Sequence, residues 1–282
     1  MATILVVPYI HDRFRSSHYL IKALFPHWAR QGHNVLIRSD LEHLPPADVA
    51  FVHVDRTVVP DRYTEALARY PVVVNRRARD ISKRTVSRNL LAPHDAWNGP
   101  VIVKTDRNAR GTPEAAHDVR EGLGPTPLTL TGYPIFDHKG LVPGYVWLDP
   151  SLVVERFLPE PDPDGFAVRM WTFLGDQERC TRYVGRSAIV KATDFVSRVP
   201  CEVPDAIRAE RERLGFDYGK FDFVLHEGRH VLLDANATPA LPASVSSLLA
   251  SSNATLATGM DAFVRATQRG DSTNVGPTSA RS

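Results

Sequence analysis

The sequence predicts an α/β protein, with an N-terminal domain built on a parallel sheet and later parts built on antiparallel hairpins. Short apolar strand patterns alternate with helical patterns over residues 1–75, and such alternation is typical of parallel sheets covered by helices. After Lys104 the chain changes character and becomes rich in proline and glycine. Two pairs of strand patterns joined at glycine-containing turns then indicate antiparallel hairpins.

Apolar periodicity defines the elements of the N-terminal domain. Leu20, Leu24 and Trp28 recur at helical spacing, and Gly32 is placed to end that helix. The segment DRYTEALARY (residues 61–70) predicts a second helix. The expected strands are the apolar runs at residues 3–7, 34–40, 49–55 and 72–75.

The later elements follow in chain order from the same signals. A basic segment at 76–91 predicts a helix, VIVK predicts a strand that ends at Lys104, and PDPDG predicts a turn. A polar end without periodicity predicts a disordered tail at 268–282. The remaining expected elements are an apolar extended run at 152–160, a hairpin at 166–185 that turns at Gly175-Asp176, a helix at 206–215 and a second hairpin at 221–236.

Composition excludes several classes of protein. The net charge of +2 gives no strong field toward nucleic acid or membrane, and the arginines at 76–88 lack the interleaved aromatic residues that stack on bases. Cys180 and Cys201 are too few for a disulfide framework, so we expect small buried side chains in a reducing compartment. No apolar run approaches ~20 residues. We therefore expect a cytoplasmic protein without a membrane partner.

One motif points to zinc, and its surroundings argue against that interpretation. Residues 226–230 spell H-E-x-x-H, which binds zinc only on a helix, where the two imidazoles share one face. Strand-forming residues flank the motif and Gly228 lies inside it; a glycine there costs a helix about 1 kcal/mol. The sequence therefore favours a hairpin loop with exposed histidines over a zinc hydrolase.

The same hairpin carries a second candidate metal site. Alternation along a strand places Asp234 and Asn236 on one face and Ala235 on the other. If Asp222 joins them from the neighbouring strand, two carboxylates face each other and repel unless a cation lies between them. Carboxylate and amide oxygens suit Mg²⁺, with Mn²⁺ as an alternative ion. The other interpretation is an exposed Asp222 and an Asn236 that only opens a turn.

The length of the hairpin loop decides between these interpretations. A two-residue turn at 227–228 would place Asp222 opposite Leu233, whereas a three-residue loop at 227–229 would place it opposite Asp234. Only the second register gathers the three oxygen-bearing side chains. The sequence leaves both registers open.

The order of these parts resembles the ATP-grasp superfamily. The most specific similarity is an acid on one strand and acid-x-Asn on the next, represented here by Asp222 and Asp234-Ala235-Asn236. The resemblance implies an ATP-grasp-like fold, in which a parallel α/β domain is followed by two lobes with antiparallel sheets that enclose a nucleotide. The implied divisions are 1–75 for the N-terminal domain, 76–160 for the small nucleotide-binding lobe ending in the hinge, and 161–267 for the C-terminal lobe.

The resemblance also implies roles for further residues. Lys83 and Lys104 are similar to the lysines that contact nucleotide phosphates. The loop that follows Lys104 has one glycine, Gly111, where the family's covering loop is glycine-rich, which implies a cover that is either stiffer or built differently. The implied arginines around the transferring phosphoryl group are Arg169 with Arg182 or Arg186. The implied adenine hinge comprises Val154, Glu155, Arg156, Phe157 and Leu158, and Glu160 is implied to accept hydrogen bonds from ribose.

The activity implied by the resemblance is ligation. ATP and Mg²⁺ would convert a carboxylate, small or peptidic, to an acyl phosphate that an amine then attacks, and residues 11–18 are candidates to line the acceptor site. An ATP-grasp-type kinase and a nucleotide-binding module with little turnover are the alternatives. Neither substrate follows from the residues, and a homo-oligomer stays open.

Overall fold

The structure is a computed structural model that describes residues 1–124, 130, 132–191, 195–241, 246 and 249–270. Residues 271–282, most of the expected tail, lie outside the described residues, while Gln268 and Arg269 end a helix. No helix in the described ranges is both long enough and apolar enough to cross a membrane.

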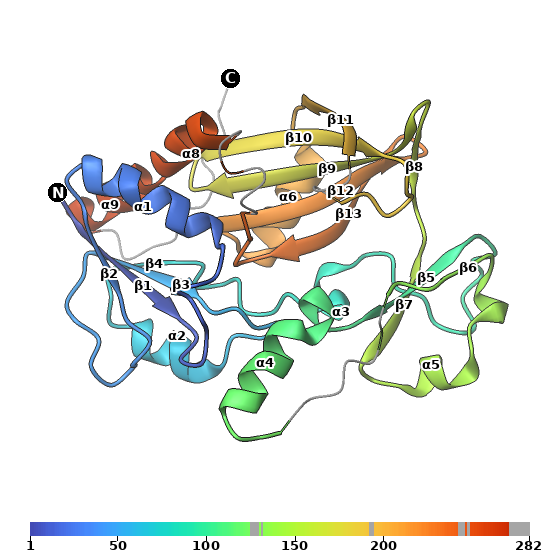
Figure 1. Ribbon diagram of the computed structural model, residues 1–282, viewed down its shortest axis with the longest axis horizontal. Coiled ribbons are helices and arrows are strands. Elements are labelled where there is room, and N and C mark those ends of the chain that lie inside the picture. The colour runs from blue at the N-terminus through green and yellow to red at the C-terminus, as the bar shows by residue number, and fades with distance from the viewer. Residues whose placement is uncertain (125–129, 131, 192–194, 242–245, 247–248, 271–282) are drawn as a thin grey trace.

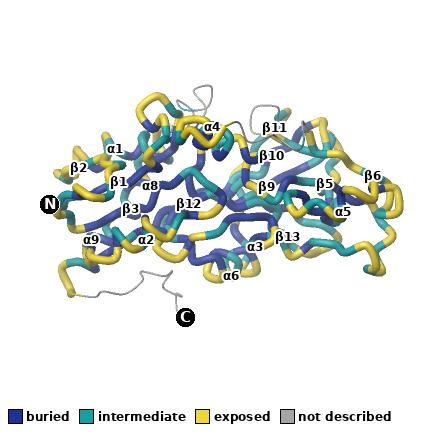
Figure 2. The backbone as a smooth tube through the Cα atoms, turned by 90° about the horizontal axis from the view of Figure 1, so that it is seen from below, coloured by how far each residue is buried: buried dark blue, intermediate teal, exposed yellow. Residues whose placement is uncertain are grey.

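The N-terminal domain contains the expected parallel sheet (Figure 1). Its strands are arranged in the order β2-β1-β3-β4 and all pair in parallel. Figure 2 shows that β1 and β3, at its centre, are buried along most of their length. The elements are β1 (Thr3–Pro8), α1 (Leu20–Arg30), β2 (Asn34–Ile37), β3 (Val49–His53), α2 (Asp61–Leu67) and β4 (Val72–Val74).

Helices from both ends of the chain cover this sheet. Alternate residues of β1 point to opposite faces, so that Ile4 packs with α1 while Leu5 packs with α2. The C-terminal helices α8 (Ala250–Ala257) and α9 (Met260–Arg269) join α1 on its face, and Trp28 Nε1 donates to Ala257 O over 2.9 Å. Residues expected in the C-terminal lobe therefore complete the core of the N-terminal domain.

The small lobe is a three-stranded antiparallel sheet in the order β6-β5-β7. The predicted strand ending at Lys104 is confirmed as β5, and the predicted apolar run begins with β7. The lobe and its connections comprise α3 (Lys83–Val86), β5 (Val101–Thr105), η1 (Asn108–Gly111), α4 (Thr112–Arg120), β6 (Ile135–Phe136), η2 (Lys139–Leu141), α5 (Gly144–Leu148) and β7 (Leu152–Arg156).

The predicted basic helix over 76–91 is wrong, because only α3 is helical there. The flanking backbone groups are engaged by other segments instead: Ile81 N donates to Thr57 O over 2.9 Å, and Leu91 N donates to Val154 O over 2.8 Å. A helix would need those amides for its own i−4 bonds. Tertiary pairing therefore overrides the local helical pattern.

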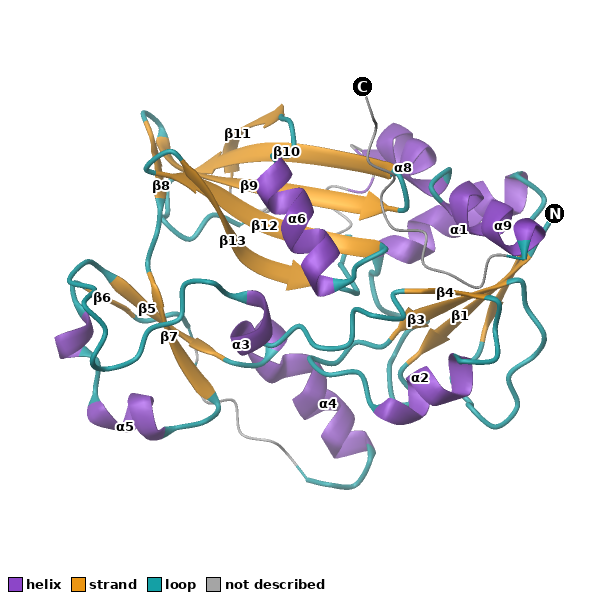
Figure 3. Cartoon of the chain, turned by 180° about the vertical axis from the view of Figure 1, so that it is seen from behind, coloured by secondary structure: helices purple, strands orange, loops and turns teal. Residues whose placement is uncertain are grey.

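The large C-terminal sheet is antiparallel, in the order β11-β10-β9-β12-β13 with β8 beside β9. Both predicted hairpins are confirmed, as β9–β10 and β12–β13, and Figure 3 shows helix α6 lying across one face of the sheet. The elements are β8 (Glu160–Asp162), β9 (Gly165–Leu174), β10 (Gln177–Gly185), β11 (Phe195–Pro200), α6 (Asp205–Leu214), β12 (Tyr218–His226) and β13 (Arg229–Asn236).

Asn75 is one of the residues that join the two large sheets. Asn75 follows β4 with a φ of 62°, a left-handed conformation that asparagine tolerates. Its side-chain oxygen accepts from Asp217 N and Tyr218 N, both over 2.9 Å, and its amide donates to Tyr218 O over 2.9 Å. Asn75 N donates to the Asp217 carboxylate over 2.7 Å, although burial raises the pKa of Asp217 to about 6.

Replacing Asn75 with alanine should lower the free energy of unfolding by about 2–4 kcal/mol, because buried donors and acceptors on β12 lose their partners. Urea unfolding measures the change. Asn98→Ala, at an exposed position, should stay within about 0.5 kcal/mol of the parent. Equal losses for the two variants would contradict a joining role for Asn75.

Candidate active site

The β12–β13 hairpin combines features of both expected registers. Its turn has two residues, Glu227 and Gly228, with φ of 48° and 76°, the left-handed pair that closes tight hairpins. A β-bulge then shifts the register, so that Phe223 faces Leu232 and Asp222 faces Asp234. The extra residue on the bulged strand brings the carboxylates together without a longer loop.

The zinc interpretation fails on the geometry of the same hairpin. The motif lies on two strands and their turn, where His226 faces Arg229 and His230 faces Leu225. Adjacent pairs of a ladder point to opposite sides of the sheet, so the two imidazoles lie on different faces. His226 Nδ1 instead lies 2.7 Å from Pro159 O.

Two aspartates form a donor set that fits a hard divalent cation. Asp222 Oδ1 is buried and has no hydrogen-bond partner among the described residues, while Asp222 Oδ2 lies 2.9 Å from Lys220 Nζ. Asp234 faces it across the ladder. The side chain of Asn236 shares this face, but its Oδ1 already accepts from Thr238 N over 2.8 Å. Oxygen ligands of this kind suit Mg²⁺.

The charges of the pair differ because of their surroundings. Burial raises the pKa of Asp222, and the nearby Asp234 carboxylate raises it further. Lys220 lowers it, but not enough to reverse the shift. Burial also opposes ionisation of Asp234, but Lys83 outweighs it and holds the pKa of Asp234 below its usual range. The paired Lys83 has a raised pKa despite its burial. Asp234 is therefore the firmly ionised member of the pair.

Three lysines surround these carboxylates, each paired with an acid. Lys83 Nζ lies 2.5 Å from Asp234 Oδ1, and Lys104 Nζ lies 2.7 Å from Glu155 Oε2. The structure thus brings both sequence-predicted lysines to the cluster. Sequence reasoning missed the third, Lys220. Its position two residues before Asp222 on one strand places both on one face, and that spacing was the available signal.

The predicted hinge borders a cavity of about 210 Å³ beside this cluster. The cavity is lined on its apolar side by Val168 and Val224, which belong to one hydrophobic cluster on the sheet. Two hinge amides are already used: Arg156 N donates to Asn89 O and Phe157 N to Pro100 O, each over 2.9 Å. The other lining residues include Lys83, Lys104, Tyr133, Glu155, Leu158, Ile189, Val190, Asp222, Leu233 and Asp234.

The structure does not bring Arg169, Arg182 or Glu160 to this cluster. Arg169 faces Phe223 and Arg182 across the ladders, so these side chains lie on the sheet face that α6 covers, opposite Asp222. There Arg169 and Arg182 both form ion pairs with Glu160. The roles expected for these three residues would require the other face.

Arg186 follows β10 and is exposed. Among the described residues, the ion-pair partners of Asp222 and Asp234 are Lys220 and Lys83 rather than the expected arginines. The positive charge paired with these carboxylates therefore comes from lysines.

The segment after β5 is a strained turn followed by a helix. Ala109, Arg110 and Gly111 have φ of 45°, 60° and 76°, and left-handed backbone costs a residue with a Cβ roughly 1–2 kcal/mol. Helix α4 begins at once, and Glu114 anchors it by accepting from Thr57 N over 2.5 Å. The segment is thus held against the N-terminal domain, which favours the stiffer of the two covers expected from its single glycine.

The N-terminal domain reaches the cluster through a chain of hydrogen bonds. Thr238 N donates to Asn236 Oδ1, and Thr238 Oγ1 donates to Asp55 Oδ1, both over 2.8 Å. The hydroxyl of Tyr19 lies 2.8 Å from Asp55 and 3.1 Å from Asp12. One hydroxyl proton cannot serve two carboxylates, and burial raises the pKa of Asp12 to about 6. Within the candidate segment 11–18, Asp12 is therefore connected to the site through Tyr19 and Asp55, and His18 O accepts from Leu241 N over 2.6 Å.

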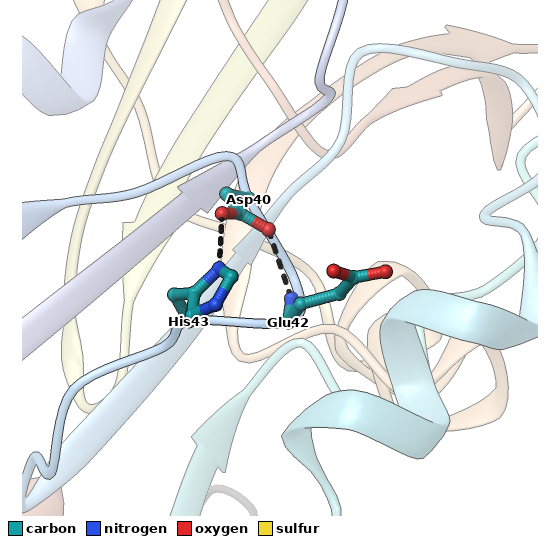
Figure 4. Close-up of side chains that lie close together, drawn as sticks. All are labelled: Asp40, Glu42 and His43. Carbon is teal, nitrogen blue, oxygen red and sulfur yellow. Dashed lines mark hydrogen bonds and ion pairs between the residues drawn. The ribbon is translucent and has the colours of Figure 1, made fainter.

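A separate group of metal-ligating residues lies on the surface. Figure 4 shows the Asp40 carboxylate accepting from the His43 ring over 2.8 Å and from Glu42 N over 3.0 Å. All three residues are exposed. These contacts close a local turn, which accounts for the grouping.

Asp234→Asn should lower the free energy of unfolding by about 1–3 kcal/mol, because Lys83, with 6% of its side chain exposed, loses its partner charge. The double variant Lys83→Met/Asp234→Asn should recover most of that loss. Urea unfolding of the four-member cycle measures the coupling. A double variant no more stable than Asp234→Asn would contradict a stabilising ion pair.

Ala109→Gly should raise stability by about 0.5–1 kcal/mol, because glycine adopts the left-handed conformation without the Cβ penalty. Ala115→Gly, inside α4, is the matched control and should cost about 1 kcal/mol. Thermal unfolding of both variants tests the opposite signs. A loss in both would show that the turn at 109 is unstrained.

Comparison with known proteins places this arrangement among known folds. No family model matches the sequence, and no curated protein matches it. The macrocyclase MdnC bound with precursor peptide MdnA, from Microcystis aeruginosa MRC, matches with a TM-score of 0.54 and 11% identity, over 92% of this chain and 99% of that one.

Two further solved structures match over nearly their whole length. D-alanine–D-alanine ligase from Bacillus anthracis, complexed with ATP, has a TM-score of 0.53 and 13% identity over 95% of this chain and 98% of that one. A Chryseobacterium gregarium RiPP-associated ATP-grasp ligase, in complex with ADP and a leader and core peptide, has a TM-score of 0.53 and 11% identity. This match covers 92% of this chain and 96% of that one. The resemblance predicted from the sequence is confirmed at the level of architecture: the chain has the ATP-grasp fold.

Proposed function

We propose that the protein is an ATP- and Mg²⁺-dependent ligase that joins a carboxylate to an amine through an acyl phosphate. The observation that carries the proposal is the facing pair Asp222 and Asp234, which lies beside a cavity with lysines on its wall. The two acids alone would repel each other and any phosphate, and the lysines alone would suit many anions. Together the acids and lysines match a nucleoside triphosphate that carries a divalent ion.

The roles of the chain's residues follow from their positions. Asp222 and Asp234 would hold Mg²⁺, which neutralises phosphate charge when bound. Lys83 and Lys104 line the cavity and would contact the phosphates. Lys220, on the site face, would compensate charge on the transferring phosphoryl group, the role that sequence analysis gave to arginines.

The cavity walls would bind adenosine. Val168 and Val224 would cover the face of the adenine, and the extended residues 155–158 would meet its edge. The amides of Arg156 and Phe157 are engaged elsewhere, so carbonyl groups of this segment and the amide of Leu158 would be the main-chain atoms that meet adenine. Adenine donates through its exocyclic amine, which suits a carbonyl acceptor.

The reaction would proceed in two displacements. A carboxylate oxygen of the first substrate attacks the γ-phosphorus and ADP leaves, and the amine then attacks the acyl carbon and phosphate leaves. Buried positive charge around the moving group lowers the barrier most where water is excluded. The N-terminal residues near Asp12 and Asp55 would border the acceptor end, because Thr238 links Asp55 to Asn236.

The test supplies the full-length protein with ATP, Mg²⁺ and pools of small carboxylates or peptides, with hydroxylamine as a general nucleophile. The expected result is ADP together with a hydroxamate, the product of hydroxylamine attack on an acyl phosphate. A stable phosphorylated product that forms without a nucleophile would identify a kinase. ATP binding without ADP release in any pool would identify a binding module.

Asp222→Asn should lower kcat/KM by about 100-fold, because the metal loses a charged ligand. Asp164→Asn, the same substitution in the exposed turn before β9, is the matched control and should keep the parent's rate. Steady-state ADP release measures both. Parent-like activity in Asp222→Asn would contradict the assignment of the metal site.

A further inference from the structure

The chain's only two cysteines meet in the fold. Cys180 lies on β10 and Cys201 follows β11, and Cys201 N donates to Cys180 O over 3.1 Å. They extend the β10–β11 register by one step beyond the facing pair Thr181 and Pro200. Both are free thiols, and their sulfur atoms lie 3.2 Å apart.

The surroundings give the two thiols different reactivity. Cys180 is buried in the core under α6, whereas Cys201 is partly exposed, and both border an open surface groove of about 850 Å³. The hydrogen bond between the two thiols lowers the pKa of Cys201, and Arg169 and Arg182 act in the same direction, against the effect of burial. The same hydrogen bond and burial raise the pKa of Cys180.

We propose that Cys180 and Cys201 are an oxidation site at which a hydroperoxide produces a reversible intramolecular disulfide. Cys201, as thiolate, attacks an oxygen of hydrogen peroxide, the O–O bond breaks and the sulfur becomes a sulfenic acid. The hydroxide that leaves takes up the proton that the Cys201 thiol released and becomes water. The Cys180 sulfur then attacks the Cys201 sulfur, the S–S bond forms, and a second water leaves with the Cys180 proton. The two sulfur atoms together lose two electrons to the peroxide.

The geometry favours this product over further oxidation. A disulfide needs the sulfur atoms at ~2 Å, so they must approach by roughly 1 Å from positions already fixed by paired backbone. The resolving thiol is therefore present before the sulfenic acid forms. Burial of Cys180 protects it from direct attack, which leaves Cys201 as the point of entry.

The bond would constrain a wall of the nucleotide cavity. Residues 186–191 follow β10 on the way to β11, and Ala188, Ile189 and Val190 among them line that cavity. A disulfide at the far end of β10 and β11 would fix these two strands to each other covalently. The oxidation chemistry itself does not depend on ligase activity, so it can be tested without a known substrate.

The experiment exposes the folded full-length protein to hydrogen peroxide, quenches it, denatures it with an alkylating reagent and measures the intact mass. The expected result is a monomer that has lost two hydrogen atoms and takes up no alkyl group, with a raised Tm that dithiothreitol reverses. Added oxygen atoms without a disulfide, covalent dimers, or two alkylated thiols after peroxide treatment would each overturn the proposal.

Single serine variants test the order of events. Cys180→Ser should retain a peroxide-sensitive thiol at Cys201 and accumulate its sulfenic acid, which a dimedone-type reagent traps. Cys201→Ser should react several-fold more slowly and trap little. Faster labelling of Cys201→Ser would overturn the assignment of Cys201 as the attacking thiol. If either variant fails to fold, peptide mapping of the parent after brief peroxide exposure shows which cysteine is trapped first.

Discussion

Two carboxylates held face to face across neighbouring strands are the constraint on which the site depends. With a two-residue turn at 227–228, Asp222 and Asp234 are opposed because a bulge removes Leu233 from the ladder. Like charges this close are unfavourable without compensation, and Lys83 and Lys220 provide it in the structure. The backbone irregularity, the lysines and the adjacent cavity are thus parts of one electrostatic arrangement, and an unbulged hairpin with the same two-residue turn would place Leu233 opposite Asp222 instead.

Sequence patterns predicted the elements well wherever one face of an element is buried. The strands of the parallel sheet, the two hairpins and the position of Lys104 follow from apolar periodicity and glycine-containing turns. The helix expected over 76–91 fails because several of its amides bond to segments that lie elsewhere along the chain. Local propensity cannot anticipate such pairing, since the partners lie far along the chain.

The candidate site was predicted in part, and its errors have one physical origin. Side chains alternate across a strand, so a single residue decides whether an arginine faces the carboxylates or α6. Arg169 lies one position from Met170, which faces Asp222, and therefore points away. Lys220 lies two residues from Asp222 on the same strand and so shares its face, but the sequence pattern did not identify it as a site residue. The bulge at Leu233 could not be predicted from the sequence, because it depends on how β12 and β13 pair rather than on the identity of any single residue.

The bond between Trp28 and Ala257 has a consequence for synthesis of the chain. The first sheet emerges from the ribosome long before α8 and α9, which complete one of its covers. The apolar side of this sheet, which includes Ile4, Val6 and Phe51, therefore remains partly exposed to solvent until α8 and α9 have been synthesised. The N-terminal sheet is synthesised before α8 and α9, which complete its core, so nascent chains that stall before residue 250 would present this surface to chaperones.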